Sequence, residues 1–335
     1  MADIELRRFV PSDLPALREL WRAVQGDARL EAYDRWRFLT TPIGPVWTSL
    51  AMAGDRCAGS YTLCPTELNI GGRVVKGAQS LDTMTHPEFR GQGLFVKLAN
   101  HCYEQAVAEG CSMVYGFPNE NSYPGFIRRL NFQHVGEVER WTRPLGRATT
   151  GSRWASLGGL VAPLLPLGRE ALGLVVTPDR PPADELTDLV AAAVPTKDIC
   201  RIHRGSAWFD YRYAPESGWT YEWLSARDRA GALAGAAVWR FDPSDNRSYL
   251  LELIGGAEAR SHLLRTILLA ARDRGGVAIG AMGNDPDLVS TLKATGFMKR
   301  PSFHFIVRNF STATLPANLH WPAAWRLVTG DFDTV

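Results

Sequence analysis

The sequence predicts an α/β (α+β) protein with two domains, each built on a mixed, mostly antiparallel sheet flanked by helices. Its 335 residues suit two domains of ordinary size, and an apolar content of 45% is enough for two cores. The same order of strand and helix patterns also occurs twice. In each repeat a short helix ends in a similar tripeptide, which is Leu130-Asn131-Phe132 in the first half and Thr295-Gly296-Phe297 in the second.

The first half begins with an expected strand over residues 4–9. A helix follows, with Ser12 or Asp13 as its N-cap and Pro15 in its first turn. A second helical pattern over residues 28–39 is rich in aromatic side chains. Antiparallel strands are then expected over residues 46–52, 57–66 and 67–79, and Gly71-Gly72 predicts a tight hairpin turn.

A glycine-rich segment between a strand and a helix is the most informative part of the chain. The run 79–85 predicts a strand, Arg90-Gly91-Gln92-Gly93 follows, and residues 94–107 carry apolar side chains at helical spacing. Backbone N–H groups left free at such a helix start bind phosphate. A third glycine of the dinucleotide fingerprint is missing, and no Gly-Lys-Ser/Thr of a P-loop follows. The segment therefore predicts a site for another phosphorylated cofactor.

The following elements resemble the core of the GNAT acyl-CoA N-acyltransferase family over roughly residues 3–140. A buried strand is expected over residues 111–117, followed by a polar loop and the short helix that ends at Phe132. The family motif Arg/Gln-x-x-Gly-x-Gly/Ala corresponds to residues 90–95, where Phe95 replaces the final small residue. Residues 115–123 resemble a bacterial subgroup that is associated with cell-surface polysaccharide synthesis.

The resemblance implies acetyl-CoA or another acyl-CoA as co-substrate. Strand 80–85 would pair with the pantetheine amides, and the amides of residues 91–95 would bind the pyrophosphate. Arg90 would contact a phosphate, and an ion pair with Glu88 is an equal alternative for it. Asn119 and Asn121 would bind the cofactor, although one of them is expected to cap the short helix. The cofactor-binding residues predicted in this way are Met84, Thr85, Arg90, Gly91, Gln92, Gly93, Leu94, Phe95, Asn119 and Asn121.

The resemblance also implies a general acid, which many family members supply as a tyrosine five residues before the closing Phe. That position is Ile127, which cannot donate a proton. Tyr123, one turn earlier, is a candidate acid; the alternative is an aromatic side chain packed on its neighbours. Asp82 is a candidate base, or else a structural hydrogen-bond acceptor. His86, before a proline, is expected to shape the turn.

The chain ends in an aromatic and acidic tail that contains Asp331 and Asp333. We hypothesise that this tail folds back toward the acceptor cleft, where either carboxylate would bind a cationic amine. A disordered acidic terminus is the alternative. The aromatic pattern over residues 28–39 also has two interpretations: these side chains form one wall of the acceptor cleft, or they pack as a stripe in the core.

In the second half the glycine motif is absent. Residues 255–260 lack the Arg-x-x-Gly-x-Gly pattern, and Glu258 lies where it would repel an anion, so this half is expected to be degenerate and not to bind CoA. The expected elements are strands over 219–226, 233–241, 249–254, 277–282 and 303–308, and helices over 257–274 and 286–294. The expected units are 1–145 (acyl-CoA-binding), 146–185 (apolar linker), 186–310 (degenerate) and 311–335 (tail).

Bulk properties exclude several other classes. The net charge of +2 with scattered arginines argues against a nucleic-acid partner. The spacing of the five cysteines predicts buried thiols and no metal. The apolar run 154–176 holds two charges and two prolines, which favours a packed connector over an interfacial segment and predicts no membrane-spanning helix. The N-terminus does not resemble a signal peptide, so a cytoplasmic location is expected.

The leading functional hypothesis is an acyl-CoA-dependent N-acyltransferase, an N-acetyltransferase in its simplest form. Its acceptor would be a small-molecule amine, such as an amino sugar or a polysaccharide precursor. The alternative is a CoA-binding sensor or scaffold without catalysis, which Ile127 favours. A third hypothesis, aminoacyl-tRNA as donor, is disfavoured by the modest net charge and the intact glycine loop. The assembly, including a homodimer, is left open.

Overall fold

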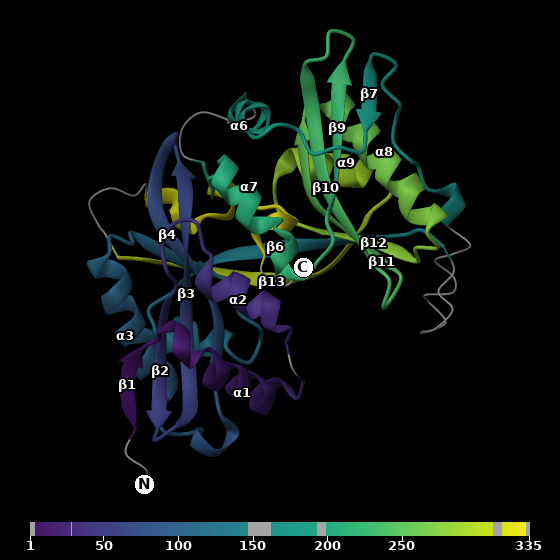
Figure 1. Cartoon of the computed structure of the whole chain (residues 1–335). Helices are drawn as coiled ribbons and strands as arrows, with labels where there is room; N and C mark the ends of the chain where they lie inside the picture. The colour runs from purple at the N-terminus through teal and green to yellow at the C-terminus, as the bar shows by residue number, and fades with distance from the viewer. Residues whose placement is uncertain (1–3, 28, 147–161, 193–198, 311–316, 333–335) are drawn as a thin grey trace.

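A single mixed sheet of 13 strands runs through both halves of the computed structural model (Figure 1). The structure describes residues 4–27, 29–146, 162–192, 199–310 and 317–332. The strand order is β1-β2-β3-β4-β5-β13-β6-β12-β11-β10-β9-β7, and β8 pairs with β3 beside this path. Helices flank the sheet in each half, so the expected α/β class with mixed sheets is confirmed.

The first half follows the predicted order of elements. Its β-hairpin turns at Gly71 and Gly72, whose φ angles are 58° and 87°. The expected strand break at residues 66 and 67 is wrong, because β3 and β4 each run unbroken through these cross-strand pairs. The elements are β1 (Glu5–Arg8), α1 (Leu14–Gln25), α2 (Glu31–Leu39), β2 (Trp47–Ala53), β3 (Arg56–Ile70), β4 (Arg73–Thr85), α3 (Leu94–Ala108), β5 (Met113–Gly116), α4 (Tyr123–Arg129) and β6 (Gln133–Pro144).

The second half repeats this order and adds elements that the sequence patterns did not indicate. One of them, β7, falls within the segment expected to be a linker and pairs with β9 as an edge strand. The elements are β7 (Leu174–Thr177), α6 (Ala183–Ala192), β8 (Cys200–Ile202), α7 (Ser206–Arg212), β9 (Glu222–Asp228), β10 (Leu233–Asp242), β11 (Arg247–Gly255), α8 (Ala257–Asp273), β12 (Ala278–Met282), α9 (Pro286–Ala294) and β13 (Met298–Asn309).

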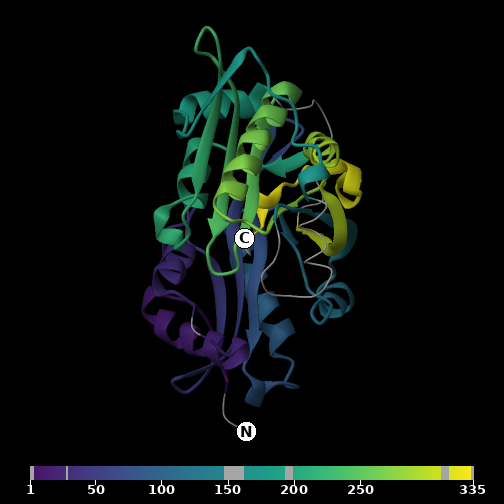
Figure 2. The same ribbon diagram turned by 90° about the vertical axis from the view of Figure 1, so that its right-hand side faces the viewer.

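The two halves exchange one strand each. β13, from the end of the second half, pairs with β5 of the first half, while β6 of the first half pairs with β12 of the second. The exchanged strands also pair with each other, so they form a seam across the middle of the molecule (Figures 1 and 2). The exchange makes the sheet continuous, and each half depends on the other for a strand.

The paired endings Leu130-Asn131-Phe132 and Thr295-Gly296-Phe297 have the same backbone geometry. Asn131 has φ 54° and Gly296 has φ 78°, both in the left-handed region. Glycine adopts this conformation without strain and asparagine tolerates it better than most residues. The asparagine in the first half therefore keeps the sharp exit from α4 that places Phe132 in the core.

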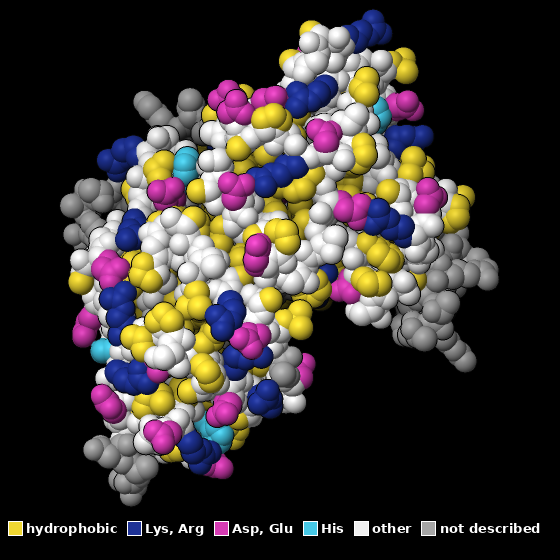
Figure 3. Space-filling model, in the orientation of Figure 1, with side chains coloured by type: hydrophobic (Ala, Val, Ile, Leu, Met, Phe, Trp, Pro, Cys, Tyr) yellow, Lys and Arg dark blue, Asp and Glu magenta, His cyan; other side chains and the backbone are white. Residues whose placement is uncertain are grey.

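Other expectations concern the surface and the thiols. None of the five cysteines, all of which belong to the described residues, forms a disulfide, and all but Cys64 are buried. No helix among the described residues is long and apolar enough to cross a membrane. The expected connector 154–176 lies partly outside the described residues; in the described part Leu164 and Leu172 are exposed. Acidic and basic side chains are interspersed over the face in Figure 3.

Candidate functional site

The first half opens between two parallel strands. β4 and β5 pair from Gly77–Met113 to Ser80–Gly116, after which β5 ends and β4 continues to Thr85. Residues 81–85 of β4 therefore have no strand partner on that side. On the other side β3 pairs with Leu81, Met84 and Thr85, and the register shift skips Asp82 and Thr83. A cavity of about 200 Å³ lies at this opening and is lined by Ser80, Leu81, Asp82, Thr83, Gly116, Phe117, Pro118, Asn119, Ser122, Phe126 and Ile306.

Asp82 lies at an irregularity of β4, where the register with β3 shifts. Its φ of 46° is left-handed, and a bulge of this kind bends the strand, here just beyond the last pair of β4 with β5, Ser80–Gly116. Its carboxylate oxygen Oδ2 forms ion pairs with Arg29 Nη1 at 3.1 Å and with Arg37 Nε at 3.3 Å. Arg29 also binds Asp34 of α2, so the ion pairs tie α2 to the bent part of β4. These ion pairs agree with the alternative in which Asp82 is a structural hydrogen-bond acceptor. The role of Asp82 as a base stays a prediction.

The glycine loop lies at the exposed end of the same opening. Gly91 and Gly93 have φ angles of 80° and 72°, and α3 begins at Leu94 with no side chain capping its N-terminus. The first amides of a helix have no partner within it, so they remain available to an anion. Glu88 pairs with Arg56 at 2.9 Å, and the alternative pairing of Glu88 with Arg90 is not formed.

Phe95 is accommodated by a glycine on α4. Its ring packs edge-to-face on Phe126 with centroids 5.3 Å apart. A Cβ on Gly125 would lie 2.9 Å from Phe95 Cε1, closer than real contacts allow. The bulky residue at the last motif position is thus turned toward α4, and a backbone without a side chain makes room for it.

The loop before α4 forms a tight turn and supplies two aromatic contacts. Asn119 Oδ1 accepts hydrogen bonds from the amides of Asn121 and Ser122 at 3.1 and 3.0 Å within this turn, while Ser122, the N-cap of α4, has no side-chain cap, so the expected cap is not formed. The cofactor role of Asn119 stays a prediction. Tyr123 stacks on His304 with ring centroids 4.1 Å apart and does not line the cavity. Ile127 packs against the core beside α3. The acid role of Tyr123 and the cofactor role of Asn121 stay predictions.

A second cavity, of about 60 Å³, lies between the two halves. It is reached from the other face of β4 and β5, where Gln79, Leu81 and Tyr115 line it. Trp36 of α2 and Tyr211 of α7 stack with centroids 4.8 Å apart, and the Trp36 indole donates to the Tyr211 carbonyl. The remaining lining residues are Tyr33, Arg37, Pro42, Ile43, Cys64, Pro65, Thr66, Ile202, Trp208, Arg212, Trp219, Tyr221, Gly330, Asp331 and Phe332.

The described part of the tail reaches this second cavity. Phe332 stacks near Phe117, with centroids 4.2 Å apart, and Phe117 lines the first cavity. Asp331 lines the second cavity, but its side chain is 0% exposed: Oδ1 accepts from Arg204 at 2.6 Å and Oδ2 from the Val328 amide at 2.8 Å. Asp333 lies outside the described residues.

Burial raises the pKa of Asp331 to about 6, against the opposing effect of Arg204. Arg204 also binds Glu252, which accepts a hydrogen bond from Tyr213 at 2.8 Å. The two carboxylates therefore share one guanidinium in a buried network between β11, α7 and the tail. Sequence reasoning missed Arg204, Tyr213 and Glu252, since no motif relates residues so far apart in the chain.

In the second half the corresponding opening is filled by the protein itself. β11 and β12 pair only from Arg247–Ala278 to Tyr249–Gly280 and then separate. The tail enters there: Val328 forms a bridge with Gly283, and Thr329 Oγ1 accepts from the Met282 amide at 2.8 Å. The opening that is free in the first half is thus occupied by residues 327–329 in the second.

Comparisons with known proteins relate the chain to acyltransferases. The family model of the acetyltransferase (GNAT) domain matches residues 5–135. A probable N-acyltransferase from Enterococcus faecalis is similar in structure, with a TM-score of 0.68 and 12% identity over 92% of this chain and 73% of that chain. A GCN5-related N-acetyltransferase from Anabaena variabilis gives a TM-score of 0.66 and 13% identity over 92% and 73%.

The N-myristoyltransferase of Saccharomyces cerevisiae, solved with bound myristoyl-CoA and inhibitors, gives a TM-score of 0.63 and 11% identity over 92% of this chain and 80% of that chain. At these identities the likeness concerns the fold. A search of curated protein sequences finds no match.

Proposed function

The chain carries a GNAT acetyltransferase domain in residues 5–135, and from this premise we propose that it transfers an acyl group from acyl-CoA to an amine acceptor. One observation carries the proposal. β4 separates from β5 after Ser80, and its unpaired stretch leads to the uncapped N-terminus of α3. An extended amide-bearing chain that ends in a pyrophosphate fits this opening, because β4 supplies backbone partners and the helix start supplies amides.

The acceptor enters from the opposite face of β4 in this proposal. The cavity between the halves shares Leu81 with the first cavity, so an amine held there faces the thioester at the bend of β4. The amine nitrogen bonds to the acyl carbon, the thioester carbon–sulfur bond breaks, and CoA leaves as its thiolate with the electron pair of that bond. Holding both reactants in this geometry supplies roughly 7–11 kcal/mol of the barrier.

Proton transfer is assigned to the tail. Among the described residues, Asp331 is the acidic side chain that lines the acceptor cavity. Its ion pair with Arg204 must open for it to accept the proton of the amine. We keep a small amine, such as an amino sugar, as the acceptor class, and acetyl as the simplest acyl group.

The cofactor site is tested by adding one negative charge to the glycine loop. Gln92 is exposed, so Gln92→Glu leaves the packing intact and repels a pyrophosphate. Calorimetric titration with acetyl-CoA should give binding about tenfold weaker, or about 1.4 kcal/mol. The control Gln25→Glu adds the same charge at an exposed position at the end of α1. Equal affinity of both variants, or no binding to the unmodified protein, contradicts the site.

A non-catalytic CoA sensor is the second candidate, because Ile127 packs into the core where many relatives place a proton donor. Thiol release from acetyl-CoA across a library of amines separates the two. Binding without release for every amine favours the sensor, and release with one amine class identifies the acceptor.

A further inference from the structure

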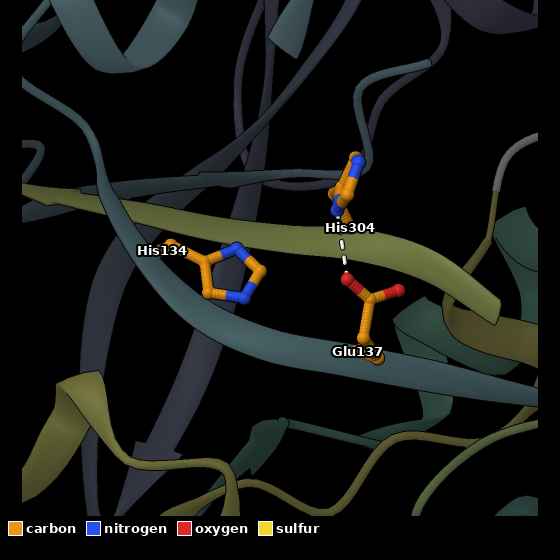
Figure 4. Close-up of side chains that lie close together, drawn as sticks. All are labelled: His134, Glu137 and His304. Carbon is orange, nitrogen blue, oxygen red and sulfur yellow. Dashed lines mark hydrogen bonds and ion pairs between the residues drawn. The ribbon is translucent and has the colours of Figure 1, made fainter. Parts of the chain in front are cut away.

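Two histidines and a glutamate meet on the exchanged strands, away from both cavities. His134 and Glu137 belong to β6 and His304 to β13, and each offers a ligand atom within 4.8 Å of the others (Figure 4). His304 and Glu137 are direct cross-strand partners, with Nδ1 2.8 Å from Oε1. Because the strands come from different halves of the chain, the cluster exists only after the halves have exchanged strands.

The local backbone brings His134 onto the same face as Glu137. The two residues are three positions apart, which in a regular strand would place them on opposite faces. The register of β6 and β13 shifts between Phe305 and Ile306, opposite Gly136, whose φ is 156°. A bulge of this kind inserts one residue and re-aims the side chains beside it. The ring centroids of His134 and His304 consequently lie 5.8 Å apart.

Neighbouring side chains hold His304 in place. Tyr123 stacks on its ring at 4.1 Å and meets His134 edge-on at 5.6 Å. While Nδ1 faces Glu137, Nε2 faces Glu120 Oε1 at 3.1 Å. A carboxylate on the far nitrogen of a ligating histidine is the usual outer partner in metal sites, where it fixes the ring orientation.

From this arrangement we infer that His134, Glu137 and His304 form a binding site for a divalent transition metal of the Zn²⁺ type. Two imidazoles and one carboxylate suit zinc and its neighbours rather than Mg²⁺ or Ca²⁺, which take oxygen ligands. Zinc bonds of about 2.0–2.2 Å place tetrahedral ligand atoms roughly 3.4 Å apart, so small side-chain rotations close the site. Three protein ligands leave a fourth position open to water.

The consequence of binding follows from where the ligands lie. A metal would link β6 to β13 and fasten the seam between the halves. It would also hold the first residue of α4, Tyr123, against His304, next to Ser122 and Asn119 of the acyl-CoA cavity.

The test uses the full-length protein after chelator treatment, titrated with ZnCl₂ by calorimetry. We expect one site of micromolar affinity or tighter, and a rise in the thermal midpoint with added zinc. His304→Ala and His134→Ala should each abolish the site, and Glu120→Gln should weaken it about tenfold. His86→Ala, which removes a histidine outside the cluster whose Nδ1 accepts a hydrogen bond from the Glu88 amide, should leave it unchanged.

A second readout does not depend on heat signals. CoCl₂ bound at a site with two imidazoles and a carboxylate gives visible d–d absorption, which His304→Ala should remove. No zinc binding by the unmodified protein would mean that the cluster is an ion pair only. Binding that persists in the His134→Ala/His304→Ala double variant would place the metal elsewhere. Either result overturns the site.

Discussion

The ring of Phe95 occupies the space that a side chain on Gly125 would need, with 2.9 Å between Phe95 Cε1 and the position of a Cβ on Gly125. Phe95 lies in the first turn of α3, next to the glycine loop, and Gly125 lies in α4, so this contact couples the two helices that border the acyl-CoA opening. The large residue at the end of the loop motif and the small residue on α4 form one packing unit.

The first prediction tests this unit by a double-mutant cycle. Gly125→Ala should lower the free energy of unfolding by about 1 kcal/mol, because overpacking costs about 1–3 kcal/mol and helix propensity returns up to about 1. Adding Phe95→Ala removes the clash, so the double variant should be more stable than the sum of the single changes by at least about 0.5 kcal/mol. Urea unfolding measures all four proteins, and strict additivity would contradict the coupling.

The second prediction concerns Asp82, which holds Arg29 and Arg37 beneath the bend of β4. Asp82→Asn leaves the buried guanidinium of Arg37 and the half-buried one of Arg29 with one partner fewer each and should cost about 3 kcal/mol of stability. Because α2 lines the acceptor cavity, KM for the amine should rise more than the Kd for acetyl-CoA.

Asp34→Asn is the matched control, since it loosens Arg29 without touching β4. A fall in kcat of about 10²–10⁴-fold in Asp82→Asn with KM unchanged would instead identify Asp82 as the base. Steady-state kinetics with varied amine separates the two outcomes.

The third prediction follows from the raised pKa of Asp331, about 6 against an ordinary 3.8. As a proton acceptor, Asp331 must be ionised, so kcat/KM should rise as pH increases through about 6 and level off above it. The free energy of unfolding, in contrast, should fall as the pH rises. The folded state binds more protons than the unfolded state between pH 3.8 and about 6, so this contribution is present at low pH and lost as pH rises.

Asp331→Asn should remove both dependences. Glu252→Gln serves as control, because Glu252 shares Arg204 and is equally buried but does not line the acceptor cavity. If Glu252→Gln abolishes activity as fully as Asp331→Asn does, the network acts on structure alone. Rate profiles and urea unfolding over pH 5–8 provide the measurements.

The fourth prediction addresses the filled opening of the second half. A Cβ on Gly283 would lie 2.3 Å from the Leu327 carbonyl oxygen, and Gly283 has φ 144°. Gly283→Ala should therefore displace the tail and speed hydrogen exchange over residues 325–332. Gly231→Ala changes a glycine of φ 88° with nothing within 4 Å and should leave that exchange unchanged.

Acetyl-CoA stoichiometry should stay at one per chain in the unmodified protein, since residues 327–329 occupy the second opening. Two equivalent sites by calorimetry would show that the tail does not block it.

Several features of the first half could be predicted from local sequence. Alternating apolar residues, Gly71-Gly72 and the Arg90–Gly93 loop depend on the backbone preferences of neighbouring residues, and these predicted the strands, the hairpin and the start of α3. Helix α9 was predicted to the residue, because Pro286 and Gly296 mark its ends. The break expected within β3 was wrong, because one long strand and two short strands show the same alternation of apolar and polar residues, so the pattern cannot distinguish them.

The sequence by itself thus determined the fold class, the order of elements in the first half and the glycine loop, because each depends on contacts between residues close in the chain. Only the tertiary structure decided which half receives β6 and β13, because the same strand pattern can pair in either sheet. It also decided the partners of Asp82 and Asp331, the filling of the second opening by the tail, and the meeting of His134, Glu137 and His304. These contacts join residues far apart in the chain, whose distances are fixed only when both halves close around one sheet.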